Sequence, residues 1–124
     1  MLPTIIAGDF SAAPDAASVR FLSGLQSLAG HSVYYHDAWS VAGVGPGHTW
    51  TADNPNAKTV IDQIVRQPGH RRRVDYVFVG SWPAHPQACC AIRVATLAFD
   101  QPSEGIWVSD HFGVVVDLEV GRDP

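Results

Sequence analysis

The sequence predicts a layered α/β domain, and two patterns carry this prediction. A short apolar run at the start of the chain, "LPTIIAG", is followed by residues that recur at helical spacing. Later segments alternate apolar and polar side chains with the two-residue period of a strand. A strand followed by a helix is the first unit of a layered fold of this kind.

The first strand is predicted over "LPTIIAG", because adjacent isoleucines suit a strand that is buried on both faces. A helix is predicted next, with Asp15 as its N-cap and its end near Gly30. Its apolar positions are Val19, Leu22, Leu25 and Leu28. Residues 31–70 are predicted to be irregular, because "VGPGH", "TADNPN" and "RQPGH" supply turn residues, with one short helix over "AKTVIDQIV".

Three further strands are predicted in the second half of the chain. "RRVDYVFVG" alternates so that Asp75 shares a face with Val77 and Val79. "AIRVATLAF", residues 91–99, is the next strand, and "FGVVVDLEV", residues 112–120, is the last. Because a buried carboxylate without a partner is costly or takes up a proton, we expect Asp75 to be paired.

Length and charge limit the class of protein. The 124 residues have the size and composition of one globular domain, so we expect a single domain over residues 1–124. A net charge of −4 is untypical of a protein that binds polyanions without sequence preference. No apolar segment approaches the roughly 20 residues that span a bilayer, and no signal peptide is recognised, so we expect a soluble, cytoplasmic protein.

The residues that could carry chemistry stand next to the predicted strands. Asp9 ends the first strand, and Asp110 and His111 precede the last, although a Ser-Asp-His triplet alone is more often a turn. If Asp75 accepts a hydrogen bond from His111, it prepares the imidazole as a general base or as a stabiliser of a developing anion. Asp9 and Asp110 would add oxygen ligands that hold Mg²⁺ together with a substrate phosphate. The set suggests metal-assisted hydrolysis of a phosphate ester.

Three consecutive arginines, residues 71–73, stand at the start of the strand that carries Asp75. Solvated side chains are the commoner role for such a run, and contact with a phosphate or carboxylate is the alternative. On the second interpretation, Arg73 is a candidate for substrate binding.

Five segments in order closely resemble the carboxyl-terminal half of the endonuclease/exonuclease/phosphatase superfamily, whose domains are deoxyribonuclease I-like. The segments are "IIAGDFSAAPD", "DAWSVAG", "GHTWTADNPNA", "RRRVDYVFV" and "VSDHFGVVVDL". The superfamily includes abasic-site endonucleases, inositol polyphosphate 5-phosphatases and sphingomyelinases. The resemblance implies half of a four-layer α/β/β/α sandwich, with a mixed, mostly antiparallel sheet, a helix on one face, and the site at one edge between the two sheets.

The resemblance also implies roles for the matched residues. Asp9 matches the aspartate that orients or deprotonates the attacking water, and His111 matches the histidine that contacts the scissile phosphate. Asp75 matches the aspartate that hydrogen-bonds this histidine. Asp110 matches a carboxylate near the metal, so that Asp9 and Asp110 are the expected ligands of Mg²⁺, with Mn²⁺ as the alternative. Thr49 and Trp50 match a substrate-side loop.

Two departures from the family pattern bear on activity. Ser11 stands where the family usually has an asparagine that donates to the phosphate in the transition state, and losing one such donor costs about 100- to 1,000-fold in rate. The family's domain is also about twice as long as this chain, and its amino-terminal half carries the glutamate that ligates the metal. The two glutamates here, Glu104 and Glu119, do not align with it.

We therefore expect a metal-dependent phosphoesterase that acts on nucleic acid or on a small phosphoester. The alternative is a truncated, weakly active or inactive relative that serves as a binding or assembly module. Half of a sandwich would leave an apolar sheet face uncovered, so we also expect either a homodimer or a complementary amino-terminal half.

Overall fold

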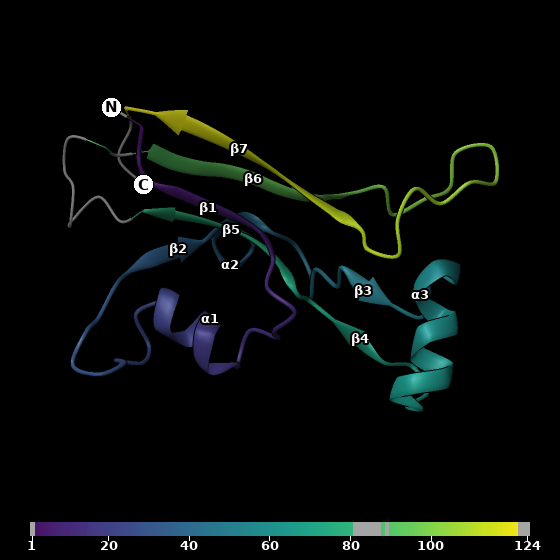
Figure 1. The fold of residues 1–124 in the computed structure, drawn as a ribbon. Helices are drawn as coiled ribbons and strands as arrows, with labels where there is room; N and C mark the ends of the chain where they lie inside the picture. The colour runs from purple at the N-terminus through teal and green to yellow at the C-terminus, as the bar shows by residue number, and fades with distance from the viewer. Residues whose placement is uncertain (1, 81–87, 89, 122–124) are drawn as a thin grey trace.

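The computed structural model describes residues 2–80, 88 and 90–121 (Figure 1). Its strands form antiparallel pairs throughout these residues. The central sheet has the order β1 (Ile5–Asp9), β5 (Asp75–Gly80), β2 (Tyr35–Asp37). The two remaining pairs are β3 (Trp50–Thr51) with β4 (Arg71–Arg72), and β6 (Cys90–Ala98) with β7 (Gly113–Val120). The predicted α/β class with mostly antiparallel strands is confirmed.

One face of the central sheet is covered by α1 (Ala17–Leu22) (Figure 1). Val19 of this helix packs against Tyr76 and Phe78 of β5, and each of the three side chains is at most 2% exposed. Phe10 meets both aromatic rings edge-on, with ring centroids 5.5 and 5.4 Å away. The alternation of β5 thus puts its aromatic side chains into the core, which leaves Asp75 on the opposite face.

The first helix is shorter than the sequence predicts, because it ends at Leu22 and not near Gly30. Gly24 has a φ of +76°, which is incompatible with a continuing right-handed helix. A Cβ at Gly24 would lie 2.4 Å from the ring of Tyr34. The ring thus leaves no room for a side chain at position 24, and Leu25 stays exposed beyond the helix.

Residues 31–70 contain more regular structure than predicted. Besides β2 and β3, α2 (Ala38–Ala42) lies in this region, and its N-cap Asp37 accepts a hydrogen bond from the Trp39 amide. The one helix predicted there is confirmed as α3 (Pro55–Val60), which continues into a π-helical turn over Ile61–Val65.

The β6–β7 pair lies on the side of the central sheet away from α1, and α2 contacts both β5 and β6 (Figure 1). On β7, the side chain of Asp117 is exposed, and those of Val116 and Leu118 are half-buried. This layering positions the loop before β7 next to the last residue of β1 and the first residue of β5. Among the described residues, no helix is both long and apolar enough to cross a membrane.

Candidate functional site

The first strand delivers Asp9 to the site, and the following turn fixes its carboxylate. The amide of Ser11 donates to Asp9 Oδ1 over 2.7 Å, and the Ser11 hydroxyl lies 3.3 Å from the same oxygen. Ser11 has a φ of +49°, in the left-handed region that asparagine adopts more readily than most residues. One oxygen of Asp9 is therefore held by its own turn, and the other, Oδ2, faces His111.

Asp75 and His111 meet beside Asp9. Asp75 lies directly opposite Asp9 in the antiparallel register of β1 and β5, and His111 comes from the segment before β7. His111 Nδ1 lies 2.8 Å from Asp75 Oδ2 and donates to it, because an ionised carboxylate only accepts. His111 Nε2 lies 4.0 Å from Asp9 Oδ2. The predicted partner of Asp75 is therefore confirmed as His111.

The charge state of His111 follows from its surroundings. Burial lowers the pKa of the imidazole, but the hydrogen bond to Asp75 and the negative charges of Asp75, Asp9 and Asp110 outweigh burial and raise the pKa above the ordinary 6.5. The side chain is 26% exposed, so solvent still reaches it. In the protonated form, Nε2–H is a donor directed away from Asp75 and available to an anion.

Thr49 accepts hydrogen bonds from the segment that carries Asp75 and from the segment that carries His111. Its side chain is fully buried, and its hydroxyl oxygen accepts from the amides of Val74 and Asp75 over 3.2 and 3.3 Å. Its carbonyl accepts from the amide of Phe112, next to His111, over 2.7 Å. Thr49 was predicted to face the substrate, but its side chain lies behind Asp75, inside the protein.

Asn54 supports the same loop from α3, and the sequence analysis missed it. Its side chain is fully buried, and its amide nitrogen donates to the Ser109 carbonyl over 2.8 Å. Its carbonyl oxygen meanwhile caps α3 by accepting from the Asn56 amide. The Ser109 hydroxyl then accepts from the His111 amide over 3.1 Å. The only signal in the sequence was the position of an asparagine before Pro55, which marks an N-cap but not its second contact.

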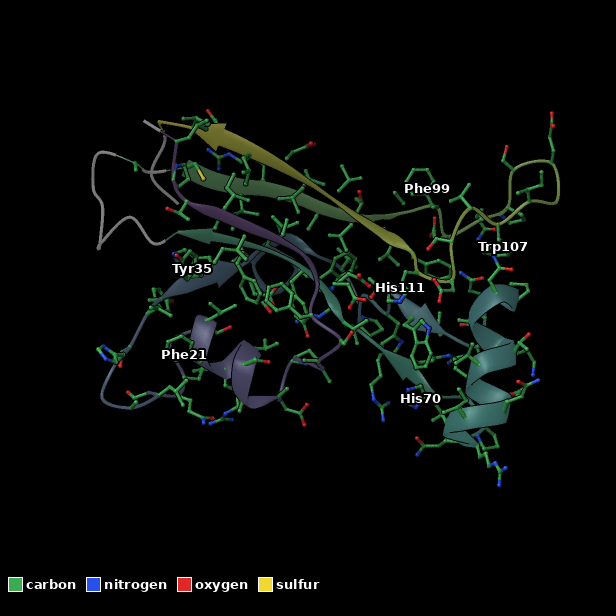
Figure 2. All side chains as sticks on the ribbon, viewed as in Figure 1. Phe21, Tyr35, His70, Phe99, Trp107 and His111 are labelled. Atoms are coloured by element: carbon green, nitrogen blue, oxygen red, sulfur yellow. The ribbon has the colours of Figure 1, made fainter. Side chains whose placement is uncertain are left out.

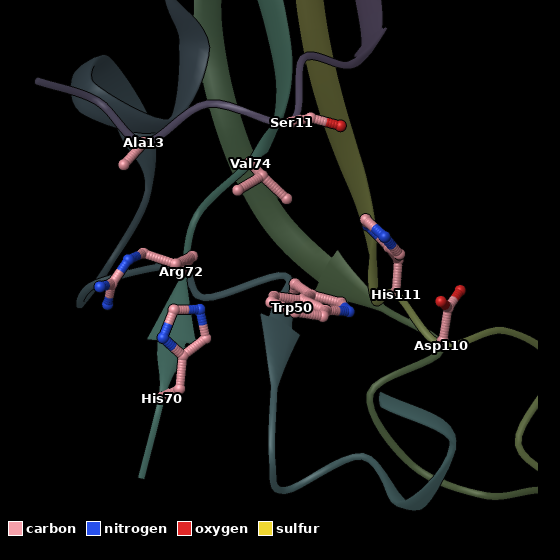
Figure 3. Close-up of a pocket in the computed structure, with 8 residues that line it drawn as sticks. All are labelled: Ser11, Ala13, Trp50, His70, Arg72, Val74, Asp110 and His111. Carbon is pink, nitrogen blue, oxygen red and sulfur yellow. The ribbon is translucent and has the colours of Figure 1, made fainter. Parts of the chain in front are cut away.

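A cavity of about 430 Å³ opens beside His111 (Figure 3). Figure 2 shows His111 and His70 on the same side of the molecule, close to β3 and β4. Four of the predicted site residues line the cavity, namely Ser11, Trp50, Asp110 and His111. Arg72 and His70 also line it, and of these His70 had no predicted role.

The structure does not bring Arg73 to the cavity. This residue is 7% exposed, and its guanidinium pairs with the buried carboxylate of Asp37 over 2.8 Å. It also lies 4.9 Å from the centre of the Tyr76 ring. The arginine with access to the cavity is its neighbour, Arg72.

Three side chains of the site could together hold a divalent metal ion. Asp9, Asp75 and His111 each offer one ligand atom, and these atoms lie within 4.8 Å of one another. Mg²⁺ prefers oxygen and is commonly held by one or two carboxylates, with water and substrate oxygens completing its shell. Asp9 Oδ2 is suited to this role. Asp110 lines the cavity beside His111 but is not part of this group of three.

An α/β fold that sets a histidine–aspartate pair against a further carboxylate has the parts of a phosphoester hydrolase. The sequence matches the profile of the Endonuclease/Exonuclease/phosphatase family over residues 2–111, and the chain belongs to this family. The resemblance noted in the sequence is therefore confirmed. Neither the curated proteins nor the solved structures that we searched gave a significant match. Members of this family act on phosphoesters and usually use a divalent metal.

Proposed function

We propose that this chain hydrolyses a phosphate ester. Asp9 orients and deprotonates the attacking water, and His111, oriented by Asp75, donates a hydrogen bond to the phosphate. The observation that carries the proposal is the meeting of Asp9, Asp75 and His111, which come from two strands and a distant loop. Such a meeting of groups distant in sequence is typical of a catalytic site.

The geometry supports these two roles. Asp9 Oδ2 and His111 Nε2 are 4.0 Å apart, which is too far for a hydrogen bond, so each can bind water or substrate. The raised pKa of His111 favours its protonated form, which is the form that donates to an anionic phosphate. Ser11 lines the cavity beside His111, and its hydroxyl would be a second donor to the phosphate on turning away from Asp9 Oδ1, to which it donates over 3.3 Å.

Asp9 and Asp110 would hold Mg²⁺, with Mn²⁺ as the alternative, and the ion would offset the negative charge that develops on the phosphate. The family's glutamate ligand has no counterpart among the described residues near the cavity. Glu119 pairs instead with Arg93 across β6 and β7, where Arg93 Nε lies 2.6 Å from the carboxylate. A ligand from another chain would complete such a site.

We propose that the chain associates with a second copy of itself. Apolar side chains remain exposed on β1 and on one face of the β6–β7 pair. Val94 (41%) and Val115 (49%) share that face, and Ile5 (44%) is exposed on β1. Packing of two such sheets would remove them from water. Sedimentation at micromolar concentration should show a dimer. A strictly monomeric profile would refute the homodimer and favour a complementary amino-terminal half as the partner.

The function is tested by hydrolysis of bis(p-nitrophenyl) phosphate with Mg²⁺ and with EDTA. We expect Mg²⁺-dependent turnover that is lost in Asp9→Ala and in His111→Ala. Asp117→Ala and His31→Ala are matched controls, because both side chains are exposed and neither lines the cavity. Absence of turnover in the unmodified chain, or turnover that survives both site substitutions, would refute the enzymatic proposal. The first of these results would favour the binding or assembly module.

A further inference from the structure

We propose that the far end of the cavity beside His111 is an anion subsite formed by Arg72 and His70. The substrate would then be a phosphoester that carries a flat ring and a second phosphate, as a nucleoside bisphosphate or a dinucleotide does. This inference rests on the proposed function, because it takes the phosphate at His111 as the one that reacts.

The arrangement of the cavity suggests such a substrate. Figure 3 shows Arg72 and His70 on one side of Trp50, and His111 with Asp110 on the other. Trp50 and Arg72 are directly opposed in the register of β3 and β4, which puts their side chains on one face. The ring of His70 meets the ring of Trp50 edge-on, with centroids 5.3 Å apart.

The cavity has an apolar part to its lining besides the polar residues. Val74 and Ala13 line it together with the Trp50 ring. Apolar surfaces beside an aromatic face suit a flat ring, which stacks without a specific hydrogen-bond pattern. A volume of about 430 Å³ lies within the range of small-molecule sites, so the cavity accommodates a ring and not only an isolated phosphate.

The charge at the far end is positive and uncompensated. Each neighbouring arginine has a carboxylate partner, since Arg71 pairs with Asp53 over 3.1 Å and Arg73 pairs with Asp37. Among the ion pairs of the described residues, Arg72 has none, and its recorded hydrogen bond runs to the Arg71 carbonyl. A guanidinium with unused N–H groups at a cavity wall is suited to a phosphate.

The positive charge of Arg72 affects the pKa of His70. Burial, and then the positive charge of Arg72, lower the pKa of its imidazole below 6.5. An anion bound between the two side chains would offset the charge of Arg72 and favour the protonated imidazole. Both residues would then contribute to binding the second phosphate.

Calorimetric titration of the whole chain, at fixed Mg²⁺, tests the subsite with thymidine 3′,5′-bisphosphate and thymidine 5′-monophosphate. The unmodified chain should bind the bisphosphate about tenfold more tightly, as expected for one charge-assisted contact. Arg72→Gln should remove this preference. Arg71→Gln is the matched control and should keep it, because Arg71 is paired with Asp53 and does not line the cavity. Trp50→Leu should weaken the binding of both nucleotides.

Equal affinity for the two nucleotides, or a preference that survives Arg72→Gln, would overturn the inference. The outcome is separable from that of the proposed function. Turnover of bis(p-nitrophenyl) phosphate without a bisphosphate preference refutes the subsite alone. A bisphosphate preference that depends on Arg72, found without turnover, supports the subsite and refutes the proposed hydrolysis.

Discussion

Replacing Thr49 by valine should destabilise the protein by removing one acceptor that serves two backbone amides. Valine keeps the shape of threonine, so the amides of Val74 and Asp75 would lose their partner inside the protein. A buried amide left without an acceptor costs about 1–3 kcal/mol. The N···O distances of 3.2 and 3.3 Å are long, which favours the lower part of that range. We expect a loss of about 2–3 kcal/mol in the free energy of unfolding.

Thr49→Ser is the matched control, because serine keeps the hydroxyl and removes one buried methyl group, at a cost of about 1 kcal/mol. Urea unfolding of the three proteins measures both losses. The valine variant should also lower kcat more than it raises KM, since Thr49 acts on Asp75 and not on the substrate. If the valine variant is no less stable than the serine variant, Thr49 does not brace the site.

Three further predictions follow from the site and its supports. In EDTA, protonated His111 should stabilise the fold fully below pH 6.5, and this contribution should fall as the pH rises through the raised pKa of His111. Urea unfolding across pH should show the fall in the unmodified chain but not in Asp75→Asn. Arg73→Met should lower the free energy of unfolding by about 3–5 kcal/mol, because it leaves the carboxylate of Asp37 buried and unpaired. Unchanged stability with a raised KM would instead support a role of Arg73 in substrate binding. Ser11→Asn should raise kcat about tenfold or more, with Ser11→Ala as the comparison; equal rates in the two variants would contradict a donor role.

The fold could be predicted where a local pattern determines the structure. The alternation of β5 predicted which of its residues share the face of Asp75, because side chains in a strand alternate whatever the strand packs against. The end of α1 could not be predicted in this way, since Leu25 and Leu28 continue the helical spacing although Gly24 has a φ of +76°. The short β2 and α2 were missed because three or five residues are too few to show a period.

The site could be predicted where a residue violated its local pattern. Asp75 stood among valines, so a partner was required, and His111 is that partner. Arg73 gave no such signal, because its partner Asp37 is 36 positions away in a segment predicted to be irregular. The hydroxyl of Thr49 likewise matched a substrate-side loop in sequence, whereas its burial depends on three segments meeting.

The two departures from the family pattern act on different parts of the chemistry, so they can be separated. Ser11 affects a donor to the phosphate that lies within this chain, and Ser11→Asn should raise activity by the same factor at every protein concentration. The glutamate that the family resemblance implies would act on the metal, which under our proposal a second chain would help to hold. In that case, specific activity should rise with protein concentration while the concentration of Mg²⁺ that gives half-maximal activity falls. Activity that is independent of protein concentration would mean that Asp9 and Asp110, with the substrate, hold the ion without help from a partner.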